Sequence, residues 1–599
     1  MYRFFSPHSI KPSGWLKRQL RIQADGLSGH LDLIWPDIRD SAWIGGDREG
    51  WERVPYWLDG FIPLAYLLED EDLIARAKKY INAILARQNE DGWICPCSAD
   101  AIAEYDTWAV QLISKVLVVY YKCSGDERIP DVIYRMMKNY YDLLSSGAIK
   151  LFNWGKARWF EAFIALNFLY ERKPESWMRE LAVILRDTGF DYEAEKEHWV
   201  RPLNKWTYGT HVVNLAMMLK IEAVVKPLLG DCFDGKARQW YDLLMKYNGT
   251  PAGIFTGDEC LSGSSPIQGT ELCAVAELMY SCELLTASTG DMEWADLLEL
   301  VAFNALPAAI SDDMWAHQYD QMSNQISCER FPGKAIFRTN SSEAHLFGLE
   351  PNFGCCTANF NQAWPKLALS AFMKNRNTVL SPISVPAELI DDGIHIKLDT
   401  EYPFKNELCY TVAPGKAFTL QVKVPASAEA VTVNGVPTEK SGLLSFDIAE
   451  NTAVTIRISY TFTPHLTNAC CGLKALRRGN LLFAMPIEYE DKRIEYEKNG
   501  VERKYPYCDH EYIGRSEWRY RIFGEDFRVN ENPVSSVPFS STNPPLTISV
   551  PVRRINWDYE DGYETVPAKT PADITPIGES EIKEFYPYGC AKLRMTQFP

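Results

Sequence analysis

The spacing of apolar residues changes once along this chain, near Asn375, and that change constrains the fold more than any other feature. From about Trp15 to Lys374, apolar residues recur at helical spacing in long runs separated by short Gly, Pro or Asp breaks. The runs cover residues 56–69, 71–88, 105–124, 130–145, 156–172, 176–188, 211–226, 235–247, 271–289, 291–309 and 359–373. About a dozen helices in consecutive hairpins predict an (α/α)6 barrel, which needs twelve. An open α-solenoid is the alternative, although no fixed sequence period is visible.

Beyond residue 375 the apolar residues alternate with a period of two, as in half-buried strands. Residues 394–398, 417–424 and 453–461 have this pattern, and Asn-Gly and Ser-Gly turns separate some of them. The fold class predicted is therefore multidomain, α plus β, with a helical barrel followed by an antiparallel β-sandwich region. We expect the barrel over residues 1–375 and a β-sandwich domain over 376–465. Residues 466–599 form a second β-rich domain or continue the sandwich.

The charge and hydropathy of the chain exclude some classes of partner. A net charge of −17 over 599 residues disfavours binding to a phosphate backbone, so we expect no nucleic acid. No stretch approaches the roughly 18–20 apolar residues of a membrane helix, so we expect no membrane association. The first residues lack a charged segment followed by an apolar one, so no secretion signal is predicted and a cytoplasmic location is expected.

Aromatic and cysteine content leave two questions open. Aromatic residues make up 13% of the chain, which suits either stacking on sugar rings or an aromatic-rich helical core. The 15 cysteines are odd in number and irregularly spaced, which favours free thiols in a reducing compartment over a disulfide framework.

Two short motifs offer a set of metal ligands. Glu271 and Cys273 are separated by one residue, and Cys355 and Cys356 are adjacent, each pair following a glycine closely. Residues two apart on a helix point about 200° away from each other, so the first pair shares an ion only at a helix end or in a loop. Three thiols and a carboxylate match a tetrahedral zinc site, and buried inert thiols are the alternative. The second adjacent pair, Cys470-Cys471, is interpreted as structural.

Several fragments together resemble a known family. They are Pro55-Tyr-Trp-Leu-Asp59, Gln268-Gly-Thr-Glu-Leu-Cys273, Phe303-Asn-Ala-Leu-Pro307, Asn352-Phe-Gly-Cys-Cys-Thr-Ala-Asn359 and Trp364-Pro-Lys366. The chain is similar in these motifs to glycoside hydrolase family 127, the β-L-arabinofuranosidase family and its relatives. The resemblance covers about residues 10–375 and extends more loosely into the β region. It implies a catalytic (α/α)6 barrel with β-sandwich domains.

The resemblance also implies a zinc site and a catalytic pair. Its metal ligands fall on Glu271, Cys273, Cys355 and Cys356. Cys355 takes the role of nucleophile, and Glu259 that of general acid/base, with Asp258 as the other acid that could serve. A zinc-bound thiol is deprotonated, so a thiolate can replace the nucleophilic carboxylate of most retaining glycosidases.

The residues expected to bind substrate come from two sources. His211 and Tyr319 resemble family positions that contact the sugar. Asp106 and Trp108 open a predicted helix, where they offer a hydroxyl acceptor and a stacking ring, or an ordinary helix cap. The helix after Trp108 lacks the histidine expected in arabinofuranosidases, which puts the sugar in question more than the reaction.

The predicted function is a retaining exo-glycosidase that releases a terminal L-arabinofuranose-like sugar from plant-type glycans. An oligosaccharide or glycoside is the expected partner, and a homodimer is left open. Three alternatives remain at this stage. The same site acts on an acidic or branched pectic sugar, the protein is a non-catalytic glycan-binding protein with a structural zinc, or zinc activates water and the anomeric configuration inverts.

Overall fold

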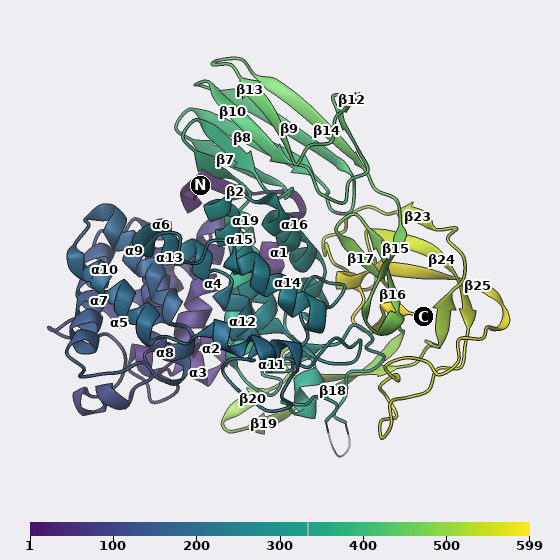
Figure 1. Cartoon of the computed structure of the whole chain (residues 1–599), viewed down its shortest axis with the longest axis horizontal. Coiled ribbons are helices and arrows are strands. Elements are labelled where there is room, and N and C mark those ends of the chain that lie inside the picture. The colour runs from purple at the N-terminus through teal and green to yellow at the C-terminus, as the bar shows by residue number, and fades with distance from the viewer. Residues whose placement is uncertain (332–334) are drawn as a thin grey trace.

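The computed structural model describes residues 1–331 and 335–599. Helices occupy the chain as far as Leu369, and strands dominate from Met373 onward. Figure 1 shows the helices packed in one body, with the green strands above it and the yellow strands beside it. The predicted fold class, a helical barrel followed by β-sheet domains, is confirmed. Within the described ranges, no helix has the length and apolar character needed to cross a membrane.

Six helical segments form a closed inner ring. They are α4 (Arg53–Leu67), α6 (Trp108–Ser124), α9 (Ala162–Arg172), the pair α12 (Val212–Met218) and α13 (Ile221–Leu229), α15 (Leu272–Thr289) and α19 (Ala363–Leu369). Each segment contacts the next, and α19 contacts α4, so the ring closes. This closure excludes the open α-solenoid. Outside it lie α1 (Gly14–Asp25), α5 (Glu71–Leu85), α7 (Ile129–Ser145), α10 (Ser176–Thr188), α14 (Lys236–Asn248) and α16 (Met292–Phe303).

Four predicted runs are interrupted in the structure. The run 156–172 contains the end of α8 (Asn153–Ala157), a 3-10 turn (Trp159–Glu161) and α9. The run 211–226 breaks between α12 and α13, and the run 291–309 breaks at Asn304, before α17 (Ala305–Ala308). The run 359–373 contains a 3-10 turn (Phe360–Gln362) followed by α19. Because the apolar spacing continues across a break of one or two residues, periodicity alone cannot locate such breaks.

Buried charges connect the inner helices to one another. Following the ring, the residues are Asp59, Lys115, Glu161, Lys220, Glu277 and Lys366, which we call the charge ring. Lys115 Nζ lies 3.1 Å from Asp59 and 3.4 Å from Glu161. Lys220 Nζ lies 2.5 Å from Glu161 and 3.0 Å from Glu277, and Lys366 Nζ lies 2.7 Å from Asp59. Acids and lysines alternate, so each buried charge is compensated by its neighbours.

Two sheets pack above the barrel, and the beginning of the chain takes part in both. The first sheet has the order β1 (Arg3–Phe4), β5 (Met373–Asn375), β6 (Thr378–Ser381), β10 (Phe418–Lys423) and β13 (Leu443–Ile448). The second has the order β12 (Val436–Thr438), β11 (Ala430–Val433), β14 (Val454–Thr461), β9 (Glu407–Pro414), β8 (Ile394–Thr400), β7 (Ala387–Asp391) and β2 (Ile10–Pro12). Strands β10 and β6 pair in parallel, whereas the sequence pattern predicted antiparallel pairing throughout. Residues 3–12 thus belong to the β region and not to the barrel.

The strands after residue 465 build a separate sheet. Its main path is β15 (His465–Asn468), β16 (Lys474–Arg478), β17 (Leu481–Pro486), β25 (Ile577–Pro587), β24 (Leu546–Arg554) and β22 (Tyr520–Ile522). Strands β18 (Tyr489–Ile494) and β21 (Asp509–Gly514) leave this sheet and pair with each other. Figure 1 shows β18 below the helical body, and β21 forms bridges with barrel loops at Cys328 and Phe347.

One buried carboxylate joins the three parts of the molecule. Glu299, on α16, accepts hydrogen bonds from Lys423 Nζ at 2.9 Å and from the Tyr402 hydroxyl at 3.0 Å, both in the sandwich. It also accepts one from Asn480 Nδ2, in the turn between β16 and β17 of the last sheet, at 2.8 Å. Since all three donors converge on a carboxylate without solvent exposure, the barrel and both β domains have a fixed arrangement.

Candidate active site

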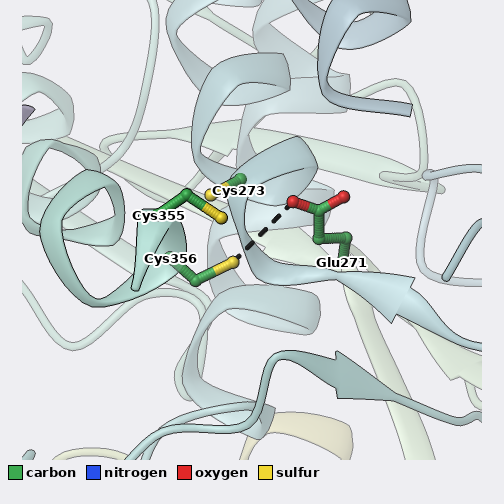
Figure 2. Close-up of side chains that lie close together, drawn as sticks. All are labelled: Glu271, Cys273, Cys355 and Cys356. Carbon is green, nitrogen blue, oxygen red and sulfur yellow. Dashed lines mark hydrogen bonds between the residues drawn. The ribbon is translucent and has the colours of Figure 1, made fainter. Parts of the chain in front are cut away.

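Four side chains at two helix starts form the candidate metal centre. Glu271 ends β3 (Thr270–Glu271) and precedes α15, so Cys273 lies in the first turn of that helix. Cys355 and Cys356 begin α18 (Cys355–Asn359). The ligand atoms of all four residues lie within 4.8 Å of one another. Figure 2 shows the three sulfur atoms and the Glu271 carboxylate turned towards a common point.

The surroundings of Glu271 fit a metal ion. Its Oε2 is buried without a hydrogen-bond partner among the described residues, and its Oε1 is 3.9 Å from Cys356 Sγ. A buried carboxylate oxygen without a partner is costly, and a cation at this point would compensate it. Three thiols and one carboxylate are the donor types and the number that zinc takes in tetrahedral sites. The residues present therefore fit zinc.

The pKa values differ among the three thiols. Hydrogen bonds from Cys273 and Cys356 hold the pKa of Cys355 well below its usual range, and the nearby Arg53 charge lowers it further. Burial raises the pKa of Cys273 and of Cys356 well above the usual value. Among these thiols, Cys355 is thus the one that most readily exists as a thiolate.

Glu259 lies beside this centre and contacts two of the expected binding residues. The Tyr319 hydroxyl is 2.6 Å from Glu259 Oε1 and 3.1 Å from Cys355 Sγ. His211 Nε2 is 3.0 Å from Glu259 Oε2. His211 precedes α12, and its Nδ1 accepts a hydrogen bond from the Asn214 backbone at 3.4 Å. Because Nδ1 is an acceptor, Nε2 carries the proton and donates to Glu259.

The backbone at Glu259 is unusual for a residue with a side chain. Its φ angle is +152°, in a region that residues other than glycine seldom occupy. Its carbonyl accepts a hydrogen bond of 2.8 Å from Val212, the first residue of α12. The segment is therefore held against α12 in a strained conformation that directs the carboxylate towards His211 and Tyr319.

The two neighbouring acids at positions 258 and 259 have different partners. The Asp258 carboxylate accepts hydrogen bonds from the Ser262 hydroxyl and from the Thr339 backbone, the latter at 3.0 Å, and it has no solvent exposure. Glu259 instead contacts the residues around Cys355. The geometry thus favours Glu259 over Asp258 as a group that exchanges protons with a ligand.

Asp106 and Trp108 both make hydrogen bonds within the protein, and sugar binding by either residue stays a prediction. The Asp106 carboxylate accepts hydrogen bonds from the backbone of Trp108, Trp154 and Gly155, at 3.0, 3.0 and 2.8 Å. The Trp108 ring has no exposed surface, and its Nε1 donates to Glu52 at 2.9 Å. The helix-cap interpretation therefore describes Asp106, and Trp108 positions Glu52.

Several residues near the site were not identified from the sequence. Arg158 lies between the rings of Trp108 and Trp154, with its Cζ 4.5 and 4.4 Å from their centres. Trp206 has 39% of its surface exposed, and its Nε1 is 3.4 Å from Glu259 Oε2. The only signal available was position, since Trp206 lies two residues before Tyr208-Gly-Thr-His211.

Known structures share this fold at low sequence identity. A GH127 β-arabinofuranosidase superposes with a TM-score of 0.71 at 15% identity, covering 100% of this chain and 98% of its own. A GH127 β-L-arabinofuranosidase from Geobacillus stearothermophilus T6 gives 0.69 at 16% identity, covering 98% of both chains. A structure described as a glycoside hydrolase gives 0.71 at 13% identity, covering 100% and 98%. No family model and no curated protein matches the sequence. The chain therefore has the complete fold of the GH127 structures.

Proposed function

We propose that this protein is a retaining exo-glycosidase that uses Cys355 as nucleophile and Glu259 as general acid/base. The contact that supports this proposal is the Tyr319 hydroxyl, which touches both groups. Because one oxygen contacts both, the two groups cannot be more than about 6 Å apart. The two catalytic carboxyl groups are about 5–5.5 Å apart in retaining glycosidases and about 6.5–9.5 Å apart in inverting ones, so the distance between Cys355 and Glu259 suits a retaining enzyme better. The likeness in fold to GH127 β-L-arabinofuranosidases favours a terminal L-arabinofuranose-like sugar.

The Tyr319 hydroxyl contacts both proposed catalytic groups. It donates a hydrogen bond of 2.6 Å to Glu259 Oε1, and its oxygen lies 3.1 Å from Cys355 Sγ. A retaining reaction starts from a protonated acid beside an ionised nucleophile, so the proposal includes a proton on Glu259 and a thiolate at Cys355.

The reaction follows in two displacements. Cys355 Sγ attacks the anomeric carbon, the bond to the glycosidic oxygen breaks, and Glu259 donates its proton to that oxygen. Glu259, now ionised, takes a proton from water, and the water oxygen displaces the sulfur from the anomeric carbon. His211 and Tyr319 hold the carboxylate in position during both steps. Zinc held by Glu271, Cys273, Cys355 and Cys356 would supply a positive charge that keeps the thiol deprotonated.

The charges around the site favour a neutral sugar over an acidic one. Burial raises the pKa of Asp320 well above its usual value, and the nearby Asp258 carboxylate raises it further. A sugar carboxylate placed here would add another negative charge to this group. We therefore expect neutral glycosides to bind better than uronides.

Turnover of a panel of 4-nitrophenyl L- and D-glycosides, including uronides, tests the proposal. We expect the wild-type protein to hydrolyse a neutral furanoside, and proton NMR to detect first the product with retained configuration. Glu259→Gln should bind the same glycoside while losing most turnover, by about 10²–10⁴-fold. An inverted first product would contradict the thiolate mechanism. Binding of glycans by the wild type without any turnover would indicate a glycan-binding protein.

A further inference from the structure

Three aromatic side chains lie together beside Glu259, on the outer side of the catalytic pair. The rings of Trp154 and Trp206 are 5.5 Å apart, and those of Trp206 and Tyr208 are 4.7 Å apart. Trp206 is 39% exposed, although it is among the largest apolar side chains of the protein. We call Trp154, Trp206 and Tyr208 the aromatic cluster.

The Trp154 member of the aromatic cluster is held in place by several contacts. The Asp106 carboxylate fixes the backbone of Trp154 and Gly155. The Arg158 guanidinium, which is 4% exposed, lies against one face of the Trp154 ring, and Arg158 Nε donates to Asn214 at 2.9 Å. Asn214 belongs to the helix that His211 caps, so the cluster and the Glu259 contacts share one support. A surface that presents exposed aromatic rings at low conformational cost is suited to ligand binding.

The position of Trp206 relative to Glu259 decides which part of a substrate the cluster would meet. The indole Nε1 is 3.4 Å from Glu259 Oε2, the carboxylate that donates its proton to the glycosidic oxygen in the proposed reaction. The group beyond that oxygen must therefore lie next to Trp206. The other exposed aromatic ring near the site, Phe353, lies on the side of Tyr319, with ring centres 6.2 Å apart.

We infer that the aromatic cluster is a subsite for the leaving group, and that this group is a further sugar ring and not a small alcohol. The inference rests on the proposed function, because it takes Glu259 to be the acid. The apolar face of a sugar ring stacks on the exposed Trp206 ring, and that binding energy is used to place the glycosidic oxygen at Glu259. The physiological substrate is accordingly an oligosaccharide, from which the enzyme removes the terminal residue.

Two probes that differ only in the leaving group test this subsite. They are methyl β-L-arabinofuranoside and a β-L-arabinofuranosyl disaccharide of L-arabinose, assayed with full-length zinc-loaded protein. We expect Trp206→Ala to lower kcat/KM about 10–100-fold for the disaccharide and less than about 3-fold for the methyl glycoside. Trp206→Phe retains a ring but not the N–H group, and it should restore most of the disaccharide activity.

Matched variants separate stacking from other effects. Phe353→Ala, on the opposite side of the site, should change kcat/KM by the same factor for both probes. Equal losses on both probes for Trp206→Ala, or no rescue by Trp206→Phe, would overturn the inference, because Trp206 would then act only through Glu259. If the wild type hydrolyses neither probe, the proposed function fails and this inference fails with it. If it hydrolyses both and Trp206→Ala does not discriminate between them, only the subsite is rejected.

Discussion

Glu277 lies one helical turn beyond Cys273 on α15, so the charge ring sits directly beneath the candidate metal centre. The helix that carries Cys273 and begins directly after Glu271 is therefore anchored by ion pairs inside the barrel. The same helix carries a second buried glutamate, Glu283, whose environment is different. Replacing glutamate by glutamine at positions 277 and 283 therefore compares the same substitution in two opposite electrostatic environments.

We predict that Glu277→Gln destabilises the protein. Three buried lysines lower the pKa of Glu277 below its usual value despite burial, which raises it, and Lys220 Nζ is 3.0 Å away. The amide leaves these lysines short of one compensating charge, at a cost of about 3–5 kcal/mol. Urea unfolding at pH 7, followed by circular dichroism, measures the change. A free energy of unfolding within 1 kcal/mol of wild type would contradict the importance of the charge ring.

We predict that Glu283→Gln has the opposite effect at high pH. Burial raises the pKa of Glu283 to about 8, while the Lys366 charge limits the rise. Between pH 4.5 and about 8, the folded state retains a proton on Glu283 that the unfolded state releases. The free energy of unfolding therefore falls as the pH rises through this range, and its dependence on this group ends above it. The amide removes that dependence and should stabilise the protein at pH 9 by a few kcal/mol, with little change at pH 4.5. Unfolding curves at the two pH values provide the comparison.

We predict that Tyr319→Phe slows the reaction without removing the metal. The variant loses the hydroxyl that contacts both Glu259 and Cys355, so the proton arrangement between them is no longer fixed. We expect kcat to fall about 10–100-fold, with a smaller change in KM. Elemental mass spectrometry should find the same zinc content as in wild type. Unchanged kcat would indicate that the bridging hydroxyl has no part in the reaction.

We predict that Cys356→Ser loses the metal and much of the thermal stability. The side chain is buried and its Sγ is 3.9 Å from Glu271, so serine removes one donor from the set. Zinc per chain should fall from one to near zero, and the melting temperature should fall as it does after chelation. Cys471→Ser is the matched control, since it changes an exposed member of the other adjacent cysteine pair. Equal zinc in both variants would reject the four-ligand centre.

The sequence was most informative where one spacing pattern runs uninterrupted. The run 176–188 coincides with α10, because its apolar residues face one side without a break. The run 211–226 divides between α12 and α13 at Lys220. The side chain of this buried lysine points into the charge ring, where it pairs with Glu161 and Glu277 from two other helical segments. Periodicity records which face is apolar, but it does not record such long-range ion pairs.

The four residues of the candidate metal centre were predictable, and their surroundings were less so. Spacing left zinc ligands and buried inert thiols as alternatives, the family resemblance favoured zinc, and the structure brings Glu271, Cys273, Cys355 and Cys356 together. Asp106 was ambiguous, because an aspartate that begins a helix and one that binds a sugar look alike in sequence. Trp206 had only its position near His211 as a signal, because the exposure of an aromatic ring depends on the tertiary packing around it.

The pairing of residues 3–12 with the sandwich has a consequence for biosynthesis. Arg3 pairs with Lys374, and Ile10 pairs with Leu389. In the sequence, one partner of each pair therefore precedes the barrel helices and the other follows them. During translation the early segment has no partner until the entire helical part has left the ribosome. This pairing joins residues more than 370 positions apart, which is a kind of contact that forms slowly. A deletion of residues 3–12 is accordingly expected to remove one edge strand from each sandwich sheet.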